Sequence, residues 1–191
     1  MYEAHQDPYC YPGTLILINK LETRDEQTLE TFEQFMTASR GQQPLPAGSL
    51  DAVHYRAIHH HLFQDVYDWA GEIRTVRIGR EGHWFCFPEY IAGQLDRLFE
   101  WLRARDGLAG LARADFVAGA THVLSELNAI HAFRDGNGRA QMAFMAELAG
   151  RADHPLRMEW LERETFIPAM IASFRGDDGP LAARMDELTR P

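Results

Sequence analysis

Apolar residues recur every three or four positions along most of the chain, the spacing that places them on one face of an α-helix. The longest series predicts a buried helix that ends directly before His131. Its members are Phe116, Ala120, Val123, Leu127 and Ile130. The same spacing predicts further helices over residues 14–21, 23–38, 51–69, 88–102, 140–148, 160–174 and 181–188. The chain is therefore expected to be mainly α-helical.

Residues that favour the start of a helix precede four of these segments. Thr23 and Glu26 form a capping box, in which each side chain accepts a hydrogen bond from a main-chain N–H of the first turn. The candidates at the other three starts are Ser49 or Asp51, Pro88, and Asp115. These residues predict where the helices begin.

One stretch breaks the helical pattern. In EIRTVRIGREGHWFCF, residues 72–87, β-branched and aromatic residues flank a Gly-Arg-Glu-Gly centre, which predicts a small β-hairpin. The rest of the sequence gives no convincing strand signal. The expected fold class is thus a mainly α-helical bundle with one hairpin.

The composition is that of one soluble domain. The chain has 191 residues, of which 46% are hydrophobic and 25% charged, so a single globular domain over residues 1–191 is expected. The formal net charge of −9 opposes non-specific binding to nucleic acid or to an anionic membrane, because both are negatively charged. The chain has two cysteines and neither a signal-peptide pattern nor a membrane-length apolar run, which predicts a cytoplasmic location.

Polar residues are concentrated in HAFRDGNGRAQM, residues 131–142. The helical patterns on both sides place this segment in a turn, whose second helix begins near Asn137. Gly136 and Gly138 let an anion approach the unpaired N–H groups of this helix start, so the turn is suited to a phosphate. A capped turn without a function is the alternative that local composition leaves open.

Three side chains of this segment suit chemistry on a phosphate. Asp135 offers a carboxylate for Mg²⁺ shared with phosphate oxygens. Arg139 offers a planar fork for a second phosphate. His131 changes protonation near neutral pH, so it can take a proton from an attacking hydroxyl. Together they predict the transfer of a phosphorus-containing group from a nucleotide.

The segment closely resembles the signature of the Fic (filamentation induced by cAMP) family, His-Pro-Phe-x-Asp/Glu-Gly-Asn-Gly-Arg-x-x-Arg, and departs from it at Ala132 and Met142. Blocks of similarity also lie upstream, in DPYCYPGT and NK within residues 7–20, HLFQDVYDWAGEIRTV at 61–76 and FCFPEYI at 85–91. The resemblance covers about residues 7–150 and leaves 151–191 as a helical remainder.

The resemblance implies a helical fold with a central motif helix, and transfer of AMP from ATP to a Ser, Thr or Tyr hydroxyl of a target protein, with Mg²⁺ as cofactor. It gives His131 the role of catalytic base and Asp135 that of Mg²⁺ ligand. The implied nucleotide-binding residues are Arg134, Asp135, Gly136, Asn137, Gly138 and Arg139, with Asn137 at the α-phosphate and Arg139 at the β-phosphate. The hairpin resembles the family's flap, which adds a strand to an extended target segment. Its implied target-binding residues are Thr75, Val76, Arg77, Ile78 and Gly79.

Met142 stands where the family has a second arginine that contacts the γ-phosphate. The loss of one charge-assisted contact weakens ATP binding by about ten- to a hundredfold. Two alternatives to AMP transfer follow from it: a transferase that uses another nucleotide or a diphosphate-linked donor such as CDP-choline, and a degenerate nucleotide-binding module. Ala132 in place of proline removes no chemical group.

Small single-domain members of this kind resemble toxins that modify type II topoisomerase subunits and are inhibited by a small antitoxin. The inhibitory helix carries Ser/Thr-x-x-x-Glu-Gly/Asn, whereas the Glu-Gly of this chain, at 81–82, has Arg77 four positions before its glutamate. We therefore expect the inhibitory helix in a separate partner, and no direct nucleic-acid or membrane partner. Residues 59–61 are three consecutive histidines, which point about 100° apart on a helix and do not make a metal site.

Overall fold

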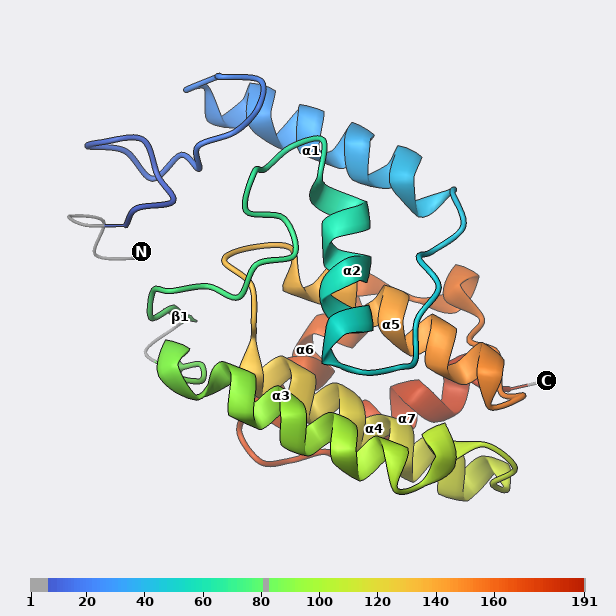
Figure 1. The fold of residues 1–191 in the computed structure, drawn as a ribbon. Coiled ribbons are helices and arrows are strands. Elements are labelled where there is room, and N and C mark those ends of the chain that lie inside the picture. The colour runs from blue at the N-terminus through green and yellow to red at the C-terminus, as the bar shows by residue number, and fades with distance from the viewer. Residues whose placement is uncertain (1–6, 81–82, 191) are drawn as a thin grey trace.

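The computed structural model of the protein describes residues 7–80 and 83–190. Seven α-helices and one hairpin lie in these ranges (Figure 1). The helices are α1 (Glu26–Gly41), α2 (Ala52–Phe63), α3 (Pro88–Arg103), α4 (Arg113–Ile130), α5 (Asn137–Arg151), α6 (Arg163–Phe174) and α7 (Gly179–Leu188). Single 3₁₀ turns are η2 (Asp106–Leu108) and η3 (Met158–Trp160), and the hairpin strands are β1 (Gly79–Arg80) and β2 (His83–Trp84). The expected fold class, a mainly α bundle with a small hairpin, is confirmed.

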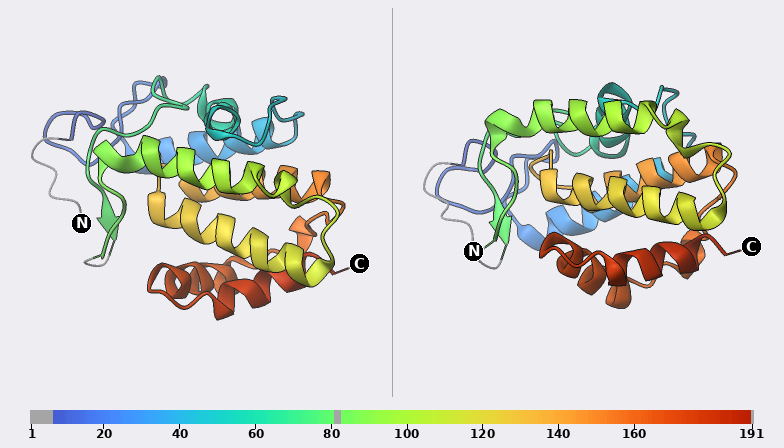
Figure 2. Two further views of the ribbon diagram at one scale, coloured as in Figure 1. Left: turned by 60° about the horizontal axis from the view of Figure 1, so that its bottom comes forward. Right: turned by 90° about the horizontal axis from the view of Figure 1, so that it is seen from below.

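Helices α4 and α5 form the middle of the molecule. Figure 2 shows them between α2 and α3 on one side and α6 and α7 on the other, in agreement with the contacts between these elements. The hairpin lies at the end of the bundle where α3 begins and α4 ends (Figure 1). The turn from α4 to α5 is therefore surrounded by packed helices on one side and faces the hairpin on the other.

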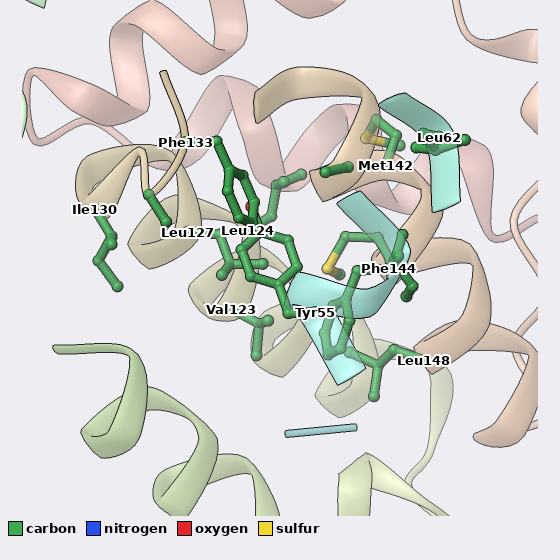
Figure 3. Close-up of a cluster of buried hydrophobic side chains, with 14 of the residues drawn as sticks. Tyr55, Leu62, Val123, Leu124, Leu127, Ile130, Phe133, Met142, Phe144 and Leu148 are labelled. Carbon is green, nitrogen blue, oxygen red and sulfur yellow. The ribbon is translucent and has the colours of Figure 1, made fainter. Parts of the chain in front are cut away.

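The core is formed where α2, α4 and α5 meet. Figure 3 shows the ring of Tyr55 between the side chains of α4 and those of α5. Tyr55, Leu127, Phe133 and Phe144 are all 0% exposed. Burying an aromatic or aliphatic side chain of this size contributes roughly 1.5–3 kcal/mol to folding. This packing fixes the two helix ends between which the motif runs.

The helix starts agree with the sequence in part. Asp51 caps α2 as predicted, because its carboxylate accepts a hydrogen bond from the His54 N–H at 2.8 Å. Helix α1 is capped by Asp25, which accepts from the Thr28 N–H at 2.8 Å, so the predicted capping box at Thr23 is wrong. The Thr23 hydroxyl instead accepts a hydrogen bond from the Asp25 N–H.

Two other predicted boundaries are wrong as well. Helix α4 begins at Arg113, so Asp115 lies inside the first turn, where its charge suits the helix dipole without capping the helix. Helix α2 ends at Phe63 rather than near residue 69, and the chain then turns through residues 64–71. Pro88 begins α3 as predicted.

The helix predicted over residues 14–21 is absent. An isolated antiparallel bridge joins Cys10 and Leu17, and the Ile18 N–H donates to the Tyr9 carbonyl at 2.8 Å. The apolar run is too short to favour a helix in isolation, and its main chain pairs instead with the arm before it. This pairing places the N-terminal arm beside the motif.

The hairpin predicted around residues 75–87 is confirmed, although its strands are only two residues long. Gly79 pairs with Trp84 and Arg80 with His83. At its base the Phe85 N–H donates to the Ile78 carbonyl at 3.1 Å, and Ile78 is buried. The tip, Glu81 and Gly82, lies outside the described residues. In the part of the chain that the structure describes, no helix is long and apolar enough to cross a membrane.

Candidate active site

His131 is the residue at which α4 ends. Its backbone lies in the left-handed region, with φ 49° and ψ 61°, and its N–H donates to the Leu127 carbonyl at 3.0 Å. A non-glycine residue adopts this conformation at a cost, which the surrounding structure must offset. The conformation turns the chain sharply into the motif and places the imidazole at the helix end.

The His131 ring is held on one side by a hydrogen bond and on its face by an aromatic ring. Nδ1 lies 3.2 Å from the Asn128 carbonyl, and Phe85 of the hairpin stacks on the imidazole at 3.8 Å between centroids and 11° between planes. Because a carbonyl only accepts, Nδ1 carries a proton, and in the neutral ring the lone pair is then on Nε2. This is the tautomer that a general base needs.

Asn137 braces the turn between the two helices. Its amide nitrogen donates to the Phe133 carbonyl at 2.8 Å, and its amide oxygen accepts from the Phe133 N–H at 2.9 Å. The Asn137 side chain is buried by this pairing. Gly136, with φ 74°, lies against the Phe63 ring, and a Cβ there would stand 2.2 Å from a ring carbon. Only glycine fits this position.

His59 of α2 supports the turn from the side of the protein core. Its ring is stacked on Phe133 at 3.8 Å and on Phe63 at 4.6 Å. Its Nδ1 accepts from the Gly71 N–H at 2.9 Å, so its Nε2 carries the proton and donates to the Asp135 carbonyl at 3.0 Å. Burial lowers the pKa of His59 to about 3, which keeps the imidazole neutral. This residue fixes the turn to the core.

The first turn of α5 is open to solvent. Asp135, Gly138 and Arg139 are exposed, whereas Gly136 and Asn137 are buried. The Asp135 carboxylate accepts from the Gly136 N–H at 2.5 Å. The start of a helix carries partial positive charge and unpaired N–H groups, so this exposed face suits an anion.

Arg139 is held over this face by α1. Its guanidinium forms an ion pair with Glu33 at 2.6 Å and donates to the Thr37 hydroxyl at 3.3 Å. It also lies over the Phe63 ring, 4.5 Å from the centroid. Glu33 in turn accepts a short hydrogen bond from the Tyr67 hydroxyl. The arginine is therefore fixed in direction before any ligand arrives.

Arg134 is paired with the N-terminal arm. Its Nε forms an ion pair with Asp7 at 2.8 Å, and the two side chains are 7% and 13% exposed. This pair fastens the N-terminal arm to the motif. The side chains of Arg134 and Asn137 are both buried in contacts within the protein, and their contacts with a nucleotide stay a prediction.

The predicted target-binding residues of the hairpin divide into exposed and inward-facing ones. Thr75 and Arg77 are exposed, Ile78 is buried, and Val76 and Gly79 are half-buried. The Arg77 guanidinium lies between two aromatic rings, 4.4 Å from that of Trp84 and 4.0 Å from that of Phe87. The Thr75 N–H donates to the Tyr9 hydroxyl at 3.1 Å.

The residues that support the motif from elsewhere in the chain carry no local signal in the sequence. Glu33 lies on α1, His59 on α2 and Tyr67 in the loop after α2, all far from residue 131 in sequence. The four-residue spacing of Glu33 and Thr37 shows that they share a helix face. It does not show that this face meets Arg139, which depends on the packing of α1 against the bundle.

Comparison with known proteins identifies the class. Residues 49–149 match the Fic/DOC family, which is more than half of the chain. The matched part contains α2, the hairpin, α3, α4 and most of α5. The chain belongs to this family, as the resemblance of its motif predicted.

Relatives and solved structures agree with this assignment. A protein of Sinorhizobium fredii named "Probable protein adenylyltransferase y4lH" is 49% identical over 188 residues, 98% of each chain. "Probable protein adenylyltransferase Fic" of Escherichia coli is 38% identical over 90% of this chain and 86% of its own. The crystal structure of the BepC protein of Bartonella tribocorum with bound AMPPNP has a TM-score of 0.85 and 27% identity, and covers 96% of both chains.

The buried neutral His59 predicts a pH-dependent stability. Its folded pKa of about 3 lies below the unfolded value of about 6.5, so its contribution is complete above pH 6.5 and is lost as pH falls toward 3. As the pH is lowered from about 7.5 to about 5, the stabilising contribution of this residue to the free energy of unfolding falls by roughly 2 kcal/mol. His59→Gln should flatten this dependence in urea unfolding without nucleotide or divalent metal.

The matched control is His60→Gln, which changes an exposed histidine on the same helix. If the free energy of unfolding of His59→Gln falls with pH as steeply as that of the wild type, the neutral, buried state of His59 is contradicted.

Proposed function

We propose that the protein transfers AMP from ATP to a Ser, Thr or Tyr hydroxyl of a target protein. The observation that carries this proposal is His131, held at the end of α4 in the tautomer of a base and directly before a turn that opens onto the start of α5. The names of the relatives from S. fredii and E. coli support the same reaction, and the AMPPNP in the BepC structure supports an adenine nucleotide as donor.

In this proposal the phosphates of ATP lie at the start of α5. The exposed Gly138 and the close-fitting Gly136 leave the N–H groups of the first turn open to the phosphate oxygens. Arg139 meets the β-phosphate, with its direction set by Glu33. Asn137 contributes by holding the turn together, and Arg134 by holding the N-terminal arm against the motif.

Asp135 would hold the Mg²⁺ that accompanies ATP. Its exposed carboxylate uses one oxygen for the Gly136 N–H, and a carboxylate has a second oxygen with which to bind a hard cation. Phosphate oxygens and water would supply the other ligands of the ion. The ion would neutralise charge on the phosphates.

The reaction needs one proton transfer and one exchange of bonds at phosphorus. The Nε2 of His131 takes the proton of the target hydroxyl as its oxygen forms a bond to the α-phosphorus. The bond from this phosphorus to the bridging oxygen breaks, and pyrophosphate leaves with the electron pair. Arg139 and the N–H groups of α5 stabilise the negative charge that develops on the leaving group.

The hairpin would hold the target segment as an added strand. Ile78 accepts a hydrogen bond from Phe85, and in an antiparallel pair alternate residues direct their main-chain groups to opposite sides. Arg77 and Gly79 therefore direct theirs to the outer edge. Phe85, which pairs with Ile78, also stacks on His131, so the hairpin that would hold the target is in direct contact with the proposed base.

We further propose a cytoplasmic toxin with a separate small antitoxin that carries an inhibitory helix, and a type II topoisomerase subunit as its target. The resemblance to small single-domain Fic toxins supports this role. The formal charge of −9 supports a protein target over direct nucleic-acid or membrane partners.

His131→Ala should abolish transfer and leave nucleotide binding within about twofold, because a base acts on the hydroxyl and not on the phosphates. The measurement is transfer from ATP labelled in its α-phosphate to lysate proteins and to a purified type II topoisomerase subunit, with AMPPNP affinity measured by calorimetry. His154→Ala, remote from the motif in sequence, is the matched histidine control. Equal labelling by wild type and His131→Ala would refute the assignment of the base.

Arg77→Pro should lower transfer to protein acceptors about tenfold, because it removes one main-chain donor at the outer edge of the hairpin. Arg77→Ala removes the same side chain and keeps the N–H, so it is the matched control. The two variants are compared in the label-transfer assay and by AMPPNP affinity. If both lower transfer equally, the side chain and not strand addition holds the target.

Met142 favours a second candidate donor. Its side chain is buried in the core beside Leu62 (Figure 3), so the position offers an apolar contact where a γ-phosphate partner would be needed. A diphosphate-linked donor such as CDP-choline needs no such partner. Transfer from CDP-choline and not from ATP would replace the AMP proposal by this one.

Met142→Arg should strengthen ATP binding about tenfold and leave ADP binding unchanged. Position 142 is three residues after Arg139 on the same face of α5, and the longer arginine can carry its charge beyond the core to the third phosphate. Calorimetry with ATP and ADP is the measurement, and Met142→Leu is the apolar control. An equal increase in affinity for ATP and ADP would show that the new arginine does not contact the γ-phosphate.

A further inference from the structure

Arg74 is a buried cation at the end of α4. Its side chain, in the segment that leads into the hairpin, is part of a residue only 1% exposed. Its Nε donates to the His131 carbonyl at 2.8 Å, and one Nη donates to the Ile130 carbonyl at 3.3 Å. Its main-chain N–H donates to the Ala132 carbonyl at 3.0 Å. A positive charge is stabilised here because the C-terminal end of a helix is partly negative.

The same guanidinium holds both limbs of the hairpin. One Nη donates at 2.7 Å to the carbonyl of Val76, which leads into β1. The other donates at 2.6 Å to the carbonyl of Cys86, which follows β2. The Cys86 N–H donates to the Ala129 carbonyl of α4 at 3.2 Å. One rigid planar group thus joins both limbs to the end of the helix that carries His131.

We propose that Arg74 is a positioning residue that sets the flap in register with His131 and so places the target hydroxyl against the base. The inference rests on the proposed function of the hairpin as the target-binding flap. Arginine suits the task because its donors point in fixed directions within one plane, whereas the three donors of lysine share a single nitrogen.

The nucleotide side of the turn has other supports. Asn137 braces the turn from within, His59 holds its Asp135 carbonyl, and Glu33 orients Arg139. A loss of the Arg74 contacts therefore loosens the flap and leaves the phosphate-binding face in place. A residue with only a general structural role would change both sides together.

The test uses Arg74→Lys, which keeps the positive charge at the helix end and loses the planar fork. Arg56→Lys is the matched control, since Arg56 also donates its Nε to a main-chain carbonyl, that of Gly71 at 2.9 Å. Three quantities are measured: amide hydrogen exchange at Phe85 and Cys86, AMPPNP affinity, and transfer of labelled AMP to lysate proteins. In Arg74→Lys we expect at least tenfold faster exchange at both amides, about tenfold lower transfer and AMPPNP affinity within twofold of wild type.

Unchanged exchange at Phe85 and Cys86 in Arg74→Lys would overturn the anchoring. Faster exchange with unchanged transfer would overturn the link from anchoring to the target, and a parallel loss of AMPPNP affinity would show a general structural role. Failure of the proposed flap function is recognised separately, by full activity of Arg77→Pro. If Arg74→Lys does not fold, amide exchange in the wild-type protein decides. We expect the Cys86 amide to exchange at a rate within tenfold of that of the His131 amide. Exchange at Cys86 that is a hundredfold faster than at His131 would overturn the proposal.

Discussion

The end of α4 is the constraint on which the rest of the site depends. A helix leaves its last four carbonyls without partners inside the helix, and a buried carbonyl without a partner costs about 1–3 kcal/mol. Here each of the four accepts a hydrogen bond from a residue beyond the last residue of the helix or from another segment of the chain. The Leu127 carbonyl accepts from the His131 N–H and the Gln141 amide, and the Asn128 carbonyl from the His131 ring. The Ala129 carbonyl accepts from the Cys86 N–H, and the Ile130 carbonyl from the Arg74 guanidinium. His131, the motif helix and the hairpin thus meet at one helix end because each supplies a partner that this end requires.

The protein is negatively charged as a whole, yet one exposed helix start in it favours an anion. The chain carries a formal charge of −9, yet the exposed start of α5 suits an anion. The attraction must be local, arising from the helix N–H groups and from Arg139, and both act only over the first few ångströms in a screened solvent. The pairing of Arg139 with Glu33 reduces this attraction further in the absence of a ligand. Polyanions in general are therefore repelled at a distance, and a ligand gains from the site only when its phosphates reach the turn.

Much of the fold could be predicted from periodicity, because the pattern of buried residues on a helix is local. The stripe that ends at Ile130, the start of α5 near Asn137 and the isolated hairpin are all confirmed. The errors occur where local signals compete. Thr23 and Asp25 both suit a helix start; Asp25 caps α1, and Thr23 accepts a hydrogen bond from the residue that does. The apolar run at 14–21 suits a helix or a strand, and pairing with residues 9–11 decides between them.

The candidate site could be predicted only in the part that is contiguous in sequence. His131, Asp135 and Arg139 belong to one turn and its helix, so their residue types together with the resemblance to the Fic signature indicate their chemistry. The side chains that hold this turn come from outside it, since a turn cannot brace itself in every direction. His59 reaches it across 76 residues and Glu33 reaches Arg139 across 106, and no local pattern reveals such contacts. Arg74 is closer in sequence, but its role depends on the simultaneous approach of three segments. A chain with the same motif and without these distant partners would keep the reactive groups and lose the geometry in which they act together.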